Sequence, residues 1–385
     1  MIGPILSEVL WVGYPTESMR VKSFATAMLM LAAASLAAGG APVRKTQNVV
    51  VIVSDGLRWQ EVFGGADPAF ATEENGVEDI AAFRREFWRE TAEARRAAVL
   101  PFFWTVVANQ GQLYGDRRSG SPARDVNGLD FSYPGYNEIL TGAADPRLNT
   151  NDPVPNPNVS VFEWLNGMPE FRGRVAAFTT WSVFPAIFNT KRSGLPVWGG
   201  WDPERIGRQP DSLNRLLATT TRLWADNVWD SFMQIALVEY LKDKKPRVLF
   251  VGYGETDEWA HSRRYDLYLA SARQVDRFIA ELWETMQAMP EYRDSTTFIV
   301  TTDHGRGRTP RDWKDHDREV PGSDEIWIAV LGPDTPPLGH RRNAAPVTQS
   351  QIAATVAALL GRDYRADVPK AAQPLTDAIR LGSAR

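Results

Sequence analysis

The chain has 385 residues, of which 43% are hydrophobic and 23% charged, as expected of a globular protein with one large or two smaller domains. The formal net charge of −4 argues against nucleic acid as a partner, because such a partner calls for a basic surface. The chain has no cysteine, which excludes disulfides, thiolate metal sites and a cysteine nucleophile.

Residues 1–45 have the pattern of a leader. A short basic stretch at 19–22 precedes a small and apolar run at 24–38. This run is shorter than the roughly 20 residues that a membrane-spanning helix needs. We therefore expect a signal peptide, a periplasmic or secreted protein, and no stable membrane insertion after cleavage. Residues 1–18 would then come from a start codon placed too early. An uncleaved membrane anchor is the alternative.

Five apolar runs predict β-strands. Those at 48–54, 247–252 and 296–300 are apolar on both faces, as central strands of a parallel sheet are. Two others lie at 174–180 and 326–331. Each run is bounded by polar or glycine-rich residues, which is typical of strand ends.

Helical patterns alternate with these strands. The clearest is 265–286, where apolar residues recur in steps of three and four. Buried helices are also expected at 100–110 and at 348–360. The alternation predicts an α/β domain with a mostly parallel sheet over residues 46–385.

Two segments look like insertions into this domain. Residues 66–96 are polar, charged and partly helical. Residues 181–233 are rich in tryptophan, glycine and proline. We expect the second segment to be a cap over a pocket, with a surface subdomain that has its own small core as the alternative.

Carboxylate and imidazole side chains follow three of the predicted strands. In a parallel α/β sheet, ligands bind outside the carboxyl ends of the strands. A mixture of aspartate and histidine suits divalent metal ions, and the nitrogen donors favour zinc over magnesium. A turn aspartate with a solvent-exposed histidine is the alternative for each pair taken alone. The candidate ligands, enough for two sites, are Asp55, Asp257, His261, Asp303, His304 and His316.

Ser132 stands just before a predicted helix. Pro134 suits the first turn of that helix and Gly142 suits its end. In one interpretation Ser132 is simply the N-cap. In the other, its hydroxyl lies at the positive end of the helix, where an anion would also bind. The local sequence leaves both interpretations open.

The order of these motifs resembles the alkaline phosphatase superfamily. The closest likeness is to its nucleotide pyrophosphatase/phosphodiesterase branch and to related bacterial alkaline phosphatase family proteins. The resemblance covers most of residues 48–362 and implies a three-layer fold with a small phosphate ester as substrate. The matching motifs are Asp55 after the first strand, Ser-x-Pro at 132–134, Thr-Gly at 141–142, Asp-x-x-x-His at 257–261, Asp-His-Gly at 303–305 and the late His316.

The resemblance also implies roles for particular residues. Ser132 would be the nucleophile and would bridge toward one of two metal ions. Asn151, or failing it Asn149, would hold a phosphate oxygen. The implied ligands are Asp257, His261 and His316 for one metal ion, and Asp55, Asp303 and His304 for the other.

The sequence departs from the family pattern in three respects. The phosphodiesterase branch usually has Thr followed by Phe-Pro-Asn, whereas Ser-Tyr-Pro-Gly stands at 132–135. Sulfatases that make formylglycine need arginine at the fifth position of this frame, where Tyr136 stands, so such a sulfatase is not expected. The phosphate-holding arginine has no clear counterpart, with Arg306 and Lys191 as candidates.

We therefore expect an exported hydrolase of phosphate esters that binds two divalent metal ions and acts through a phosphoryl-enzyme intermediate on Ser132. A phosphodiesterase, nucleotide pyrophosphatase or phosphonate-ester hydrolase on the same site is one alternative. The other is a non-catalytic, metal-binding member of the fold.

Overall fold

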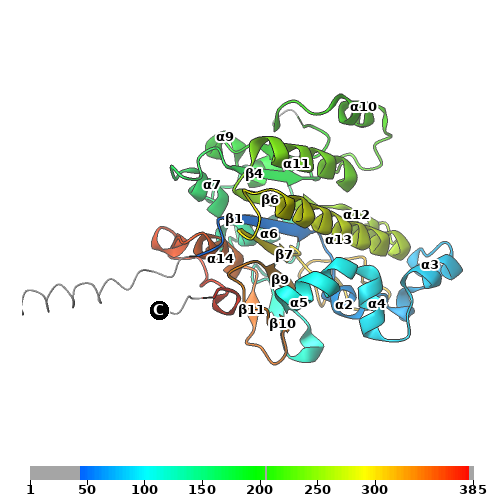
Figure 1. Ribbon diagram of the computed structural model, residues 1–385. Coiled ribbons are helices and arrows are strands. Elements are labelled where there is room, and N and C mark those ends of the chain that lie inside the picture. The colour runs from blue at the N-terminus through cyan, green and yellow to red at the C-terminus, as the bar shows by residue number, and fades with distance from the viewer. Residues whose placement is uncertain (1–43, 204–205, 381–385) are drawn as a thin grey trace, which may run out of the picture. The chain divides into compact units, whose positions relative to one another are not determined.

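An eight-stranded sheet runs through the protein in the order β10-β2-β9-β7-β1-β6-β4-β5 (Figure 1). The computed structural model describes residues 44–203 and 206–380. Neighbouring strands from β7 to β5 are parallel, whereas β9 runs antiparallel to both β7 and β2. The strands are β1 (Asn48–Ser54), β2 (Gln112–Tyr114), β4 (Val175–Thr179), β5 (Val197–Trp198), β6 (Val248–Tyr253), β7 (Thr296–Thr301), β9 (Ile328–Leu331) and β10 (Gly339–His340).

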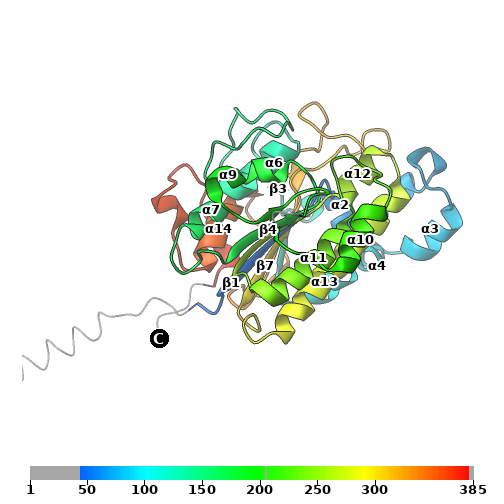
Figure 2. The ribbon, with the colours of Figure 1, turned by 90° about the horizontal axis from the view of Figure 1, so that it is seen from above.

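Helices cover both faces of this sheet, as Figure 2 shows for α6, α7 and α14 on one side and α11 and α13 on the other. The first face carries α6 (Ser132–Thr141), α7 (Val161–Asn166), α8 (Phe184–Ile187), α9 (Thr190–Ser193) and α14 (Gln351–Leu359). The second carries α2 (Trp59–Gly64), α3 (Ile80–Phe87), α4 (Ala92–Val99), α5 (Ala108–Gln110), α10 (Asp211–Thr219), α11 (Asp230–Lys244) and α13 (Tyr265–Ala288).

Shorter elements complete the fold. Helix α12 (Glu255–His261) follows β6 directly, and a three-stranded sheet has the order β11-β3-β8. Its strands are β11 (Val347–Thr348), β3 (Ala123–Arg124) and β8 (Glu325–Ile326). The remaining turns are η1 (Pro68–Phe70), η2 (Glu73–Asn75), the π-helical η3 (Phe103–Val107), η4 (Arg117–Ser119), η6 (Tyr364–Ala366) and η7 (Thr376–Ala378).

The central strands are apolar throughout because both of their faces are buried. Successive side chains of a strand point to opposite faces. In β1, Val50 and Ile52 therefore pack into the core under α11 and α13, whereas Val49 and Val51 pack into the core under α6 and α14. The predicted α/β class with a mostly parallel central sheet is confirmed, as are the central strands and the long helix α13.

The register makes three strands end level. Val53 of β1 pairs with Thr301 of β7, and Ser54 pairs with Tyr253 of β6. The residues that follow these strands therefore meet at one edge of the sheet. This edge carries the candidate site.

Two predicted elements differ from the structure. The run at 326–331 is not one strand, because it is divided between β8 and β9. Trp327 lies between these two strands, and its indole N–H donates to the carbonyl of Leu57, 2.7 Å away. The segment 100–110 is helical with a π-helical turn, but it is only half-buried, with Phe103 and Val107 facing the core.

The two predicted insertions contact the main fold. In the first, Asp67 donates its backbone N–H to the Tyr265 hydroxyl (2.9 Å) and Glu86 pairs with Arg273 (2.6 Å), so the segment packs against α13. In the second, β5 is an edge strand of the main sheet and Trp198 is fully buried. That residues 181–233 cap a pocket stays a prediction.

The predicted leader at 1–45 lies, apart from residues 44 and 45, outside the described residues. Within the described part of the chain, no helix has the length and apolar character needed to cross a membrane. Export stays a prediction from the sequence.

Replacing Leu282 by alanine should lower the free energy of unfolding by about 2–5 kcal/mol, because a buried leucine leaves a cavity. Leu282 is 0% exposed in the core between α13 and the sheet. Denaturant unfolding followed by circular dichroism measures the change. Glu284→Ala, on the exposed face of the same helix, is the control and should unfold like the wild type. Equal unfolding of both variants would contradict the proposed packing.

Candidate metal centre

Three strand ends and two helices position the predicted ligands. Asp55 follows β1 directly, and Asp303 and His304 lie just beyond β7. Asp257 and His261 lie one turn apart on α12. The start of this helix is fixed by Asp230, whose carboxylate accepts the backbone N–H of Gly254 at 3.0 Å.

His316 comes from the loop after β7, and Ser132 is the first residue of α6.

The Nε2 atom of His304 is the centre of the first group. It lies 3.4 Å from Ser132 Oγ, 3.4 Å from Asp55 Oδ1 and 3.5 Å from Asp303 Oδ2. Nδ1–H of His304 donates to the carbonyl oxygen of Gly305 at 2.9 Å. Because that carbonyl can only accept, Nδ1 keeps its proton, and Nε2 is the nitrogen that could bind a metal ion.

Two carboxylates of this group each have one satisfied and one unsatisfied oxygen. Asp55 Oδ2 accepts from the Tyr136 hydroxyl at 2.8 Å, and Asp303 Oδ1 accepts from the Gly56 backbone at 3.1 Å. Asp55 Oδ1 and Asp303 Oδ2 are buried and have no hydrogen-bond partner among the described residues. These are the two oxygens that face His304. A buried acceptor without a donor is costly, and a cation would satisfy both.

The second group adjoins the first. His261 Nε2 lies 3.0 Å from His316 Nε2 and 3.3 Å from Asp257 Oδ2. His316 donates its Nδ1–H to the carbonyl of Asp130 at 3.2 Å, which leaves Nε2 as its ligand atom. The rings of His304 and His316 stack with centroids 3.8 Å apart.

Two sets of three side chains have ligand atoms within 4.8 Å of one another, which is close enough to hold a metal ion. His304 belongs to both sets. The sets are Asp55, Asp303 and His304, and Asp257, His304 and His316. The structure thus brings together all the residues that the sequence predicted as ligands, although their roles stay predictions.

Without a metal ion, the carboxylates around His304 need a neighbouring positive charge. Burial and the Asp55 carboxylate raise the pKa of Asp303 to about 8. Burial alone would lower the pKa of His304, but the carboxylates of Asp303 and Asp55 raise it to about 9. Burial and the neighbouring His304 hold the pKa of His316 well below its ordinary value. A divalent ion would take over the charge that His304 carries in its absence.

Comparison with known proteins identifies a related family and a shared fold. The sequence profile of the Metalloenzyme superfamily matches residues 226–363, which contain every predicted ligand except Asp55 and Ser132. Wild-type alkaline phosphatase PafA superposes with a TM-score of 0.55 at 10% identity, over 88% of this chain and 100% of that one. The profile match and the shared fold support an alkaline-phosphatase-like member of this superfamily. Its place in the nucleotide pyrophosphatase/phosphodiesterase branch stays a prediction.

Other solved structures share the fold. Ps i-CgsB in complex with k-i-k-neocarrahexaose has a TM-score of 0.51 at 15% identity, over 86% of this chain and 75% of that one. A putative sulfatase from Bacteroides thetaiotaomicron VPI-5482 has a TM-score of 0.50 at 11% identity, over 87% and 75%. At such identities the likeness shows the fold alone. No curated protein sequence matches this chain.

Ser132 is not the N-cap of α6, which corrects the first of the two interpretations. The N-cap is Phe131, whose carbonyl accepts the backbone N–H of Gly135 at 3.1 Å. Ser132 is only 6% exposed, and its hydroxyl faces His304 rather than the helix backbone. Ser132, the first residue of the helix, therefore makes no capping hydrogen bond.

Arg306, a candidate for holding phosphate, has its donors engaged inside the protein. It is 1% exposed, and its guanidinium donates to the carbonyls of Gly56 (3.1 Å) and Lys314 (2.7 Å). It also contacts the Asp257 carboxylate. Arg306 therefore ties together the loops after β1 and β7 and helix α12, and it orients Asp257.

The other two candidates differ in their surroundings. Asn151 is exposed, and its Oδ1 accepts the backbone N–H of Tyr133, the residue after Ser132, at 3.0 Å. Lys191 is an exposed residue of α9 that lines a cavity of about 240 Å³ with three prolines. Asn149 is exposed. The structure therefore places Asn151, but not Lys191, in hydrogen-bond contact with the start of α6.

Sequence reasoning missed the groups that orient the ligands. Tyr136 holds Asp55 through its hydroxyl, and its position in the Ser-x-Pro-x-Tyr frame was the available signal. The backbone carbonyl of Asp130 orients His316. Every residue has such a carbonyl, so no pattern of side chains in the sequence could predict this contact. Gly56, with φ of 58°, has no room for a side chain, because a Cβ would lie 2.6 Å from Arg306 Nε and 2.9 Å from Asp257 Oδ1.

Tryptophans gather beside α12. Trp259, which lies between Asp257 and His261, packs against Trp224 with ring centroids 5.0 Å apart, and Trp224 packs against Trp229 at 4.9 Å. The tryptophan-rich segment thus reaches the helix that carries two predicted ligands.

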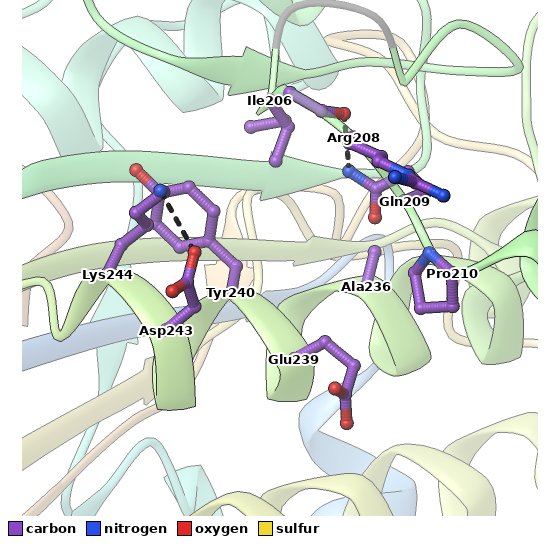
Figure 3. A pocket seen from close by; sticks show the side chains of 10 residues that line it. Ile206, Arg208, Gln209, Pro210, Ala236, Glu239, Tyr240, Asp243 and Lys244 are labelled. Atoms are coloured by element: carbon purple, nitrogen blue, oxygen red, sulfur yellow. Dashed lines mark hydrogen bonds and ion pairs between the residues drawn. The ribbon is translucent and has the colours of Figure 1, made fainter.

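A larger cavity lies elsewhere. It has a volume of about 400 Å³ and opens between α11 and the stretch before α10 (Figure 3). Its lining includes Arg208, Glu239 and Tyr240, but none of the predicted ligands. The candidate site is therefore defined by its side-chain chemistry rather than by this cavity.

Replacing Arg306 by methionine should weaken zinc binding by about 10–100-fold, as loss of a partner that orients a metal ligand typically does. Methionine keeps the apolar stem but removes the donors to Gly56 and Lys314. A zinc titration against a competing chelator measures the affinity. The control is Arg308→Met, because Arg308 is half-exposed and pairs with Glu325 instead. Wild-type affinity in Arg306→Met would refute the positioning role.

Proposed function

We propose that this protein is a metal-dependent hydrolase of phosphate esters that uses Ser132 as its nucleophile. The fold and the ligand clusters suggest the broader class, metal-dependent hydrolysis of phosphate or sulfate esters. The observation that carries the narrower proposal is the approach of Ser132 Oγ to His304 Nε2 at 3.4 Å, in the group whose buried carboxylate oxygens lack donors.

Two divalent ions would occupy the two groups of ligands. The imidazole nitrogens among these ligands favour zinc. Such a pair would supply Lewis-acid stabilisation for the oxygens of an in-line displacement. The residues that would hold them are Asp55, Asp303 and His304 for one ion, with Ser132 beside it, and Asp257, His261 and His316 for the other.

In this proposal Ser132 attacks a phosphoryl group. It opens α6, whose N-terminal end carries partial positive charge that favours a bound anion. The Ser132 oxygen forms a bond to phosphorus, and the bond from phosphorus to the alcohol oxygen breaks, so the alcohol leaves with a proton. Water then attacks the phosphoserine, releases phosphate and returns the proton to Ser132. Two displacements thus regenerate the enzyme.

Asn151 would hold an oxygen of the substrate. Its Oδ1 is occupied by Tyr133, which fixes the side-chain amide next to the start of α6. The Nδ2 group has no partner among the described residues and would donate to a phosphoryl oxygen.

A phosphate ester is favoured over a sulfate ester because Ser132 itself would be the nucleophile. Tyr136 stands where formylglycine sulfatases need arginine, and here its hydroxyl is bonded to Asp55. A diester, pyrophosphate or phosphonate ester would use the same groups. Export of the enzyme would fit the leader pattern in the sequence.

Ser132→Ala should lower turnover of an aryl phosphate by orders of magnitude, because it removes the atom that is phosphorylated. Its melting temperature and zinc content should match the wild type, since the hydroxyl makes no capping bond. Ser132→Thr keeps a hydroxyl and should retain measurable activity. A bis-aryl phosphate and an aryl sulfate, assayed in parallel, define the ester class. Wild-type turnover in Ser132→Ala would overturn the mechanism, and faster turnover of the sulfate would overturn the proposed substrate class.

The purified protein should contain close to two zinc ions per chain by elemental analysis, and a chelator should abolish turnover until zinc is restored. His304→Ala should lose at least one equivalent, since His304 belongs to both sets of ligands. His340→Ala is the matched control, because His340 pairs with Asp116 at 3.0 Å in a different part of the fold. An unchanged zinc content in His304→Ala would exclude the proposed centre.

A further inference from the structure

The cavity of about 240 Å³ lies between the loop that follows Asn151 and the short helices α8 and α9. Its lining has an apolar part and a polar part. Pro153 and Pro155 of the loop and a third proline, from α8, belong to the apolar part, and Asn189 and Lys191 belong to the polar part. The lining contains none of the predicted metal ligands.

Hydrogen bonds join one wall of this cavity to the start of α6. The Tyr133 hydroxyl donates to the carbonyl of Val154, which lies between the two prolines of the loop, at 2.5 Å. The backbone N–H of Tyr133 donates to Asn151 Oδ1 at 3.0 Å. Two residues of extended chain span at most about 7 Å, so Pro153 lies within that distance of Asn151. The cavity is therefore within reach of an organic group bonded to a phosphoryl group at Ser132.

The opposite wall is held by polar contacts with the same loop. Asn189 has a left-handed conformation with φ of 43° and caps α9, and its Nδ2 donates to the carbonyl of Asn156 at 2.9 Å. Arg192 donates to the same carbonyl at 2.9 Å and pairs with Glu163 at 2.8 Å. These contacts fix α9 and the backbone of Lys191, so the cavity is formed before a ligand enters it.

Lys191 gives the cavity a positive charge. It is exposed, and it is the only charged residue among the described residues of the lining. Its ammonium group has no ion-pair partner in the described part of the chain. The Asp226 carboxylate accepts from the Ser182 hydroxyl at 3.3 Å, but Asp226 does not line the cavity. An anion that enters the cavity therefore finds an unpaired cation there.

We propose that this cavity binds the alcohol part of the substrate, and that this alcohol contains an apolar ring with a carboxylate. The inference rests on the function proposed for Ser132. The ring packs against the prolines, and the carboxylate pairs with the Lys191 ammonium. One cation matches one anionic group of single charge. Pockets for whole drug-sized ligands span about 300–1,000 Å³, so this smaller cavity fits a single substituted ring.

The test compares phenyl phosphate with para-carboxyphenyl phosphate on the zinc-loaded full-length protein. In the wild type, KM should be lower for the carboxylated ester. Lys191→Met removes the charge and should raise that KM about tenfold relative to the KM of phenyl phosphate, because a hydrogen bond to a charged group is lost. The change should lie in KM rather than in kcat. Lys191→Arg keeps the charge and should keep the preference.

The matched control is Lys242→Met, because Lys242 is an exposed lysine of α11 that pairs with Glu239 instead. It should have the kinetic constants of the wild type for both esters. A loss of the preference in Lys242→Met equal to that in Lys191→Met would overturn the assignment to this cavity.

Binding without turnover separates this subsite from the proposed reaction. Benzylphosphonate and its para-carboxy derivative resemble the two esters, but they cannot be hydrolysed because carbon replaces the ester oxygen. Calorimetry should show tighter binding of the carboxylated compound to the wild type, and Lys191→Met should lose this difference.

The outcomes distinguish the two proposals. Hydrolysis of both esters with equal affinity for the two phosphonates, or with a preference that survives in Lys191→Met, would overturn the subsite and leave the proposed function standing. A preference that depends on Lys191 in binding, without hydrolysis of either ester, would support the subsite and overturn the reaction. If neither ester is hydrolysed and neither phosphonate binds, both proposals fail.

Discussion

Three parallel strands end at the same level in the sheet, and the rest of the site depends on this constraint. Because β1, β6 and β7 are in register, the residues after them meet at one edge, and buried carboxylates face one histidine there. A low-dielectric interior cannot hold this much unpaired negative charge without a counter-ion. The fold thus creates a demand for positive charge, which His304 and Arg306 meet in part and a metal ion would meet more fully.

Close backbone approach makes this concentration of charge possible. A Cβ on Gly135 would lie 2.3 Å from the carbonyl of Asp303, so only glycine lets α6 press against the end of β7. That approach brings Ser132 to His304. The buried guanidinium of Arg306 acts from the other side, where it joins the loop of Gly56 to Asp257. Packing and electrostatics therefore select the same geometry.

The sequence predicted much of this, and its failures have physical causes. Strand ends were visible because apolar runs stop at Asp55 and Asp303, and the parallel class of the sheet implied that they meet. The helix start was misplaced because Pro134 is tolerated throughout the first turn, so it did not show that α6 begins at Ser132. Arg306 and the carbonyl of Asp130 act through contacts with residues distant in the chain, which no local pattern encodes.

The clustered tryptophans beside α12 lie close to the predicted ligands of that helix. Indole rings whose centroids lie 4.9 and 5.0 Å apart couple electronically, and one of them, Trp259, shares a helical turn with Asp257 and His261. A shift of that helix changes the angle between the transition dipoles of the rings. Near-ultraviolet circular dichroism should therefore contain a contribution from this tryptophan cluster that changes when the helix moves.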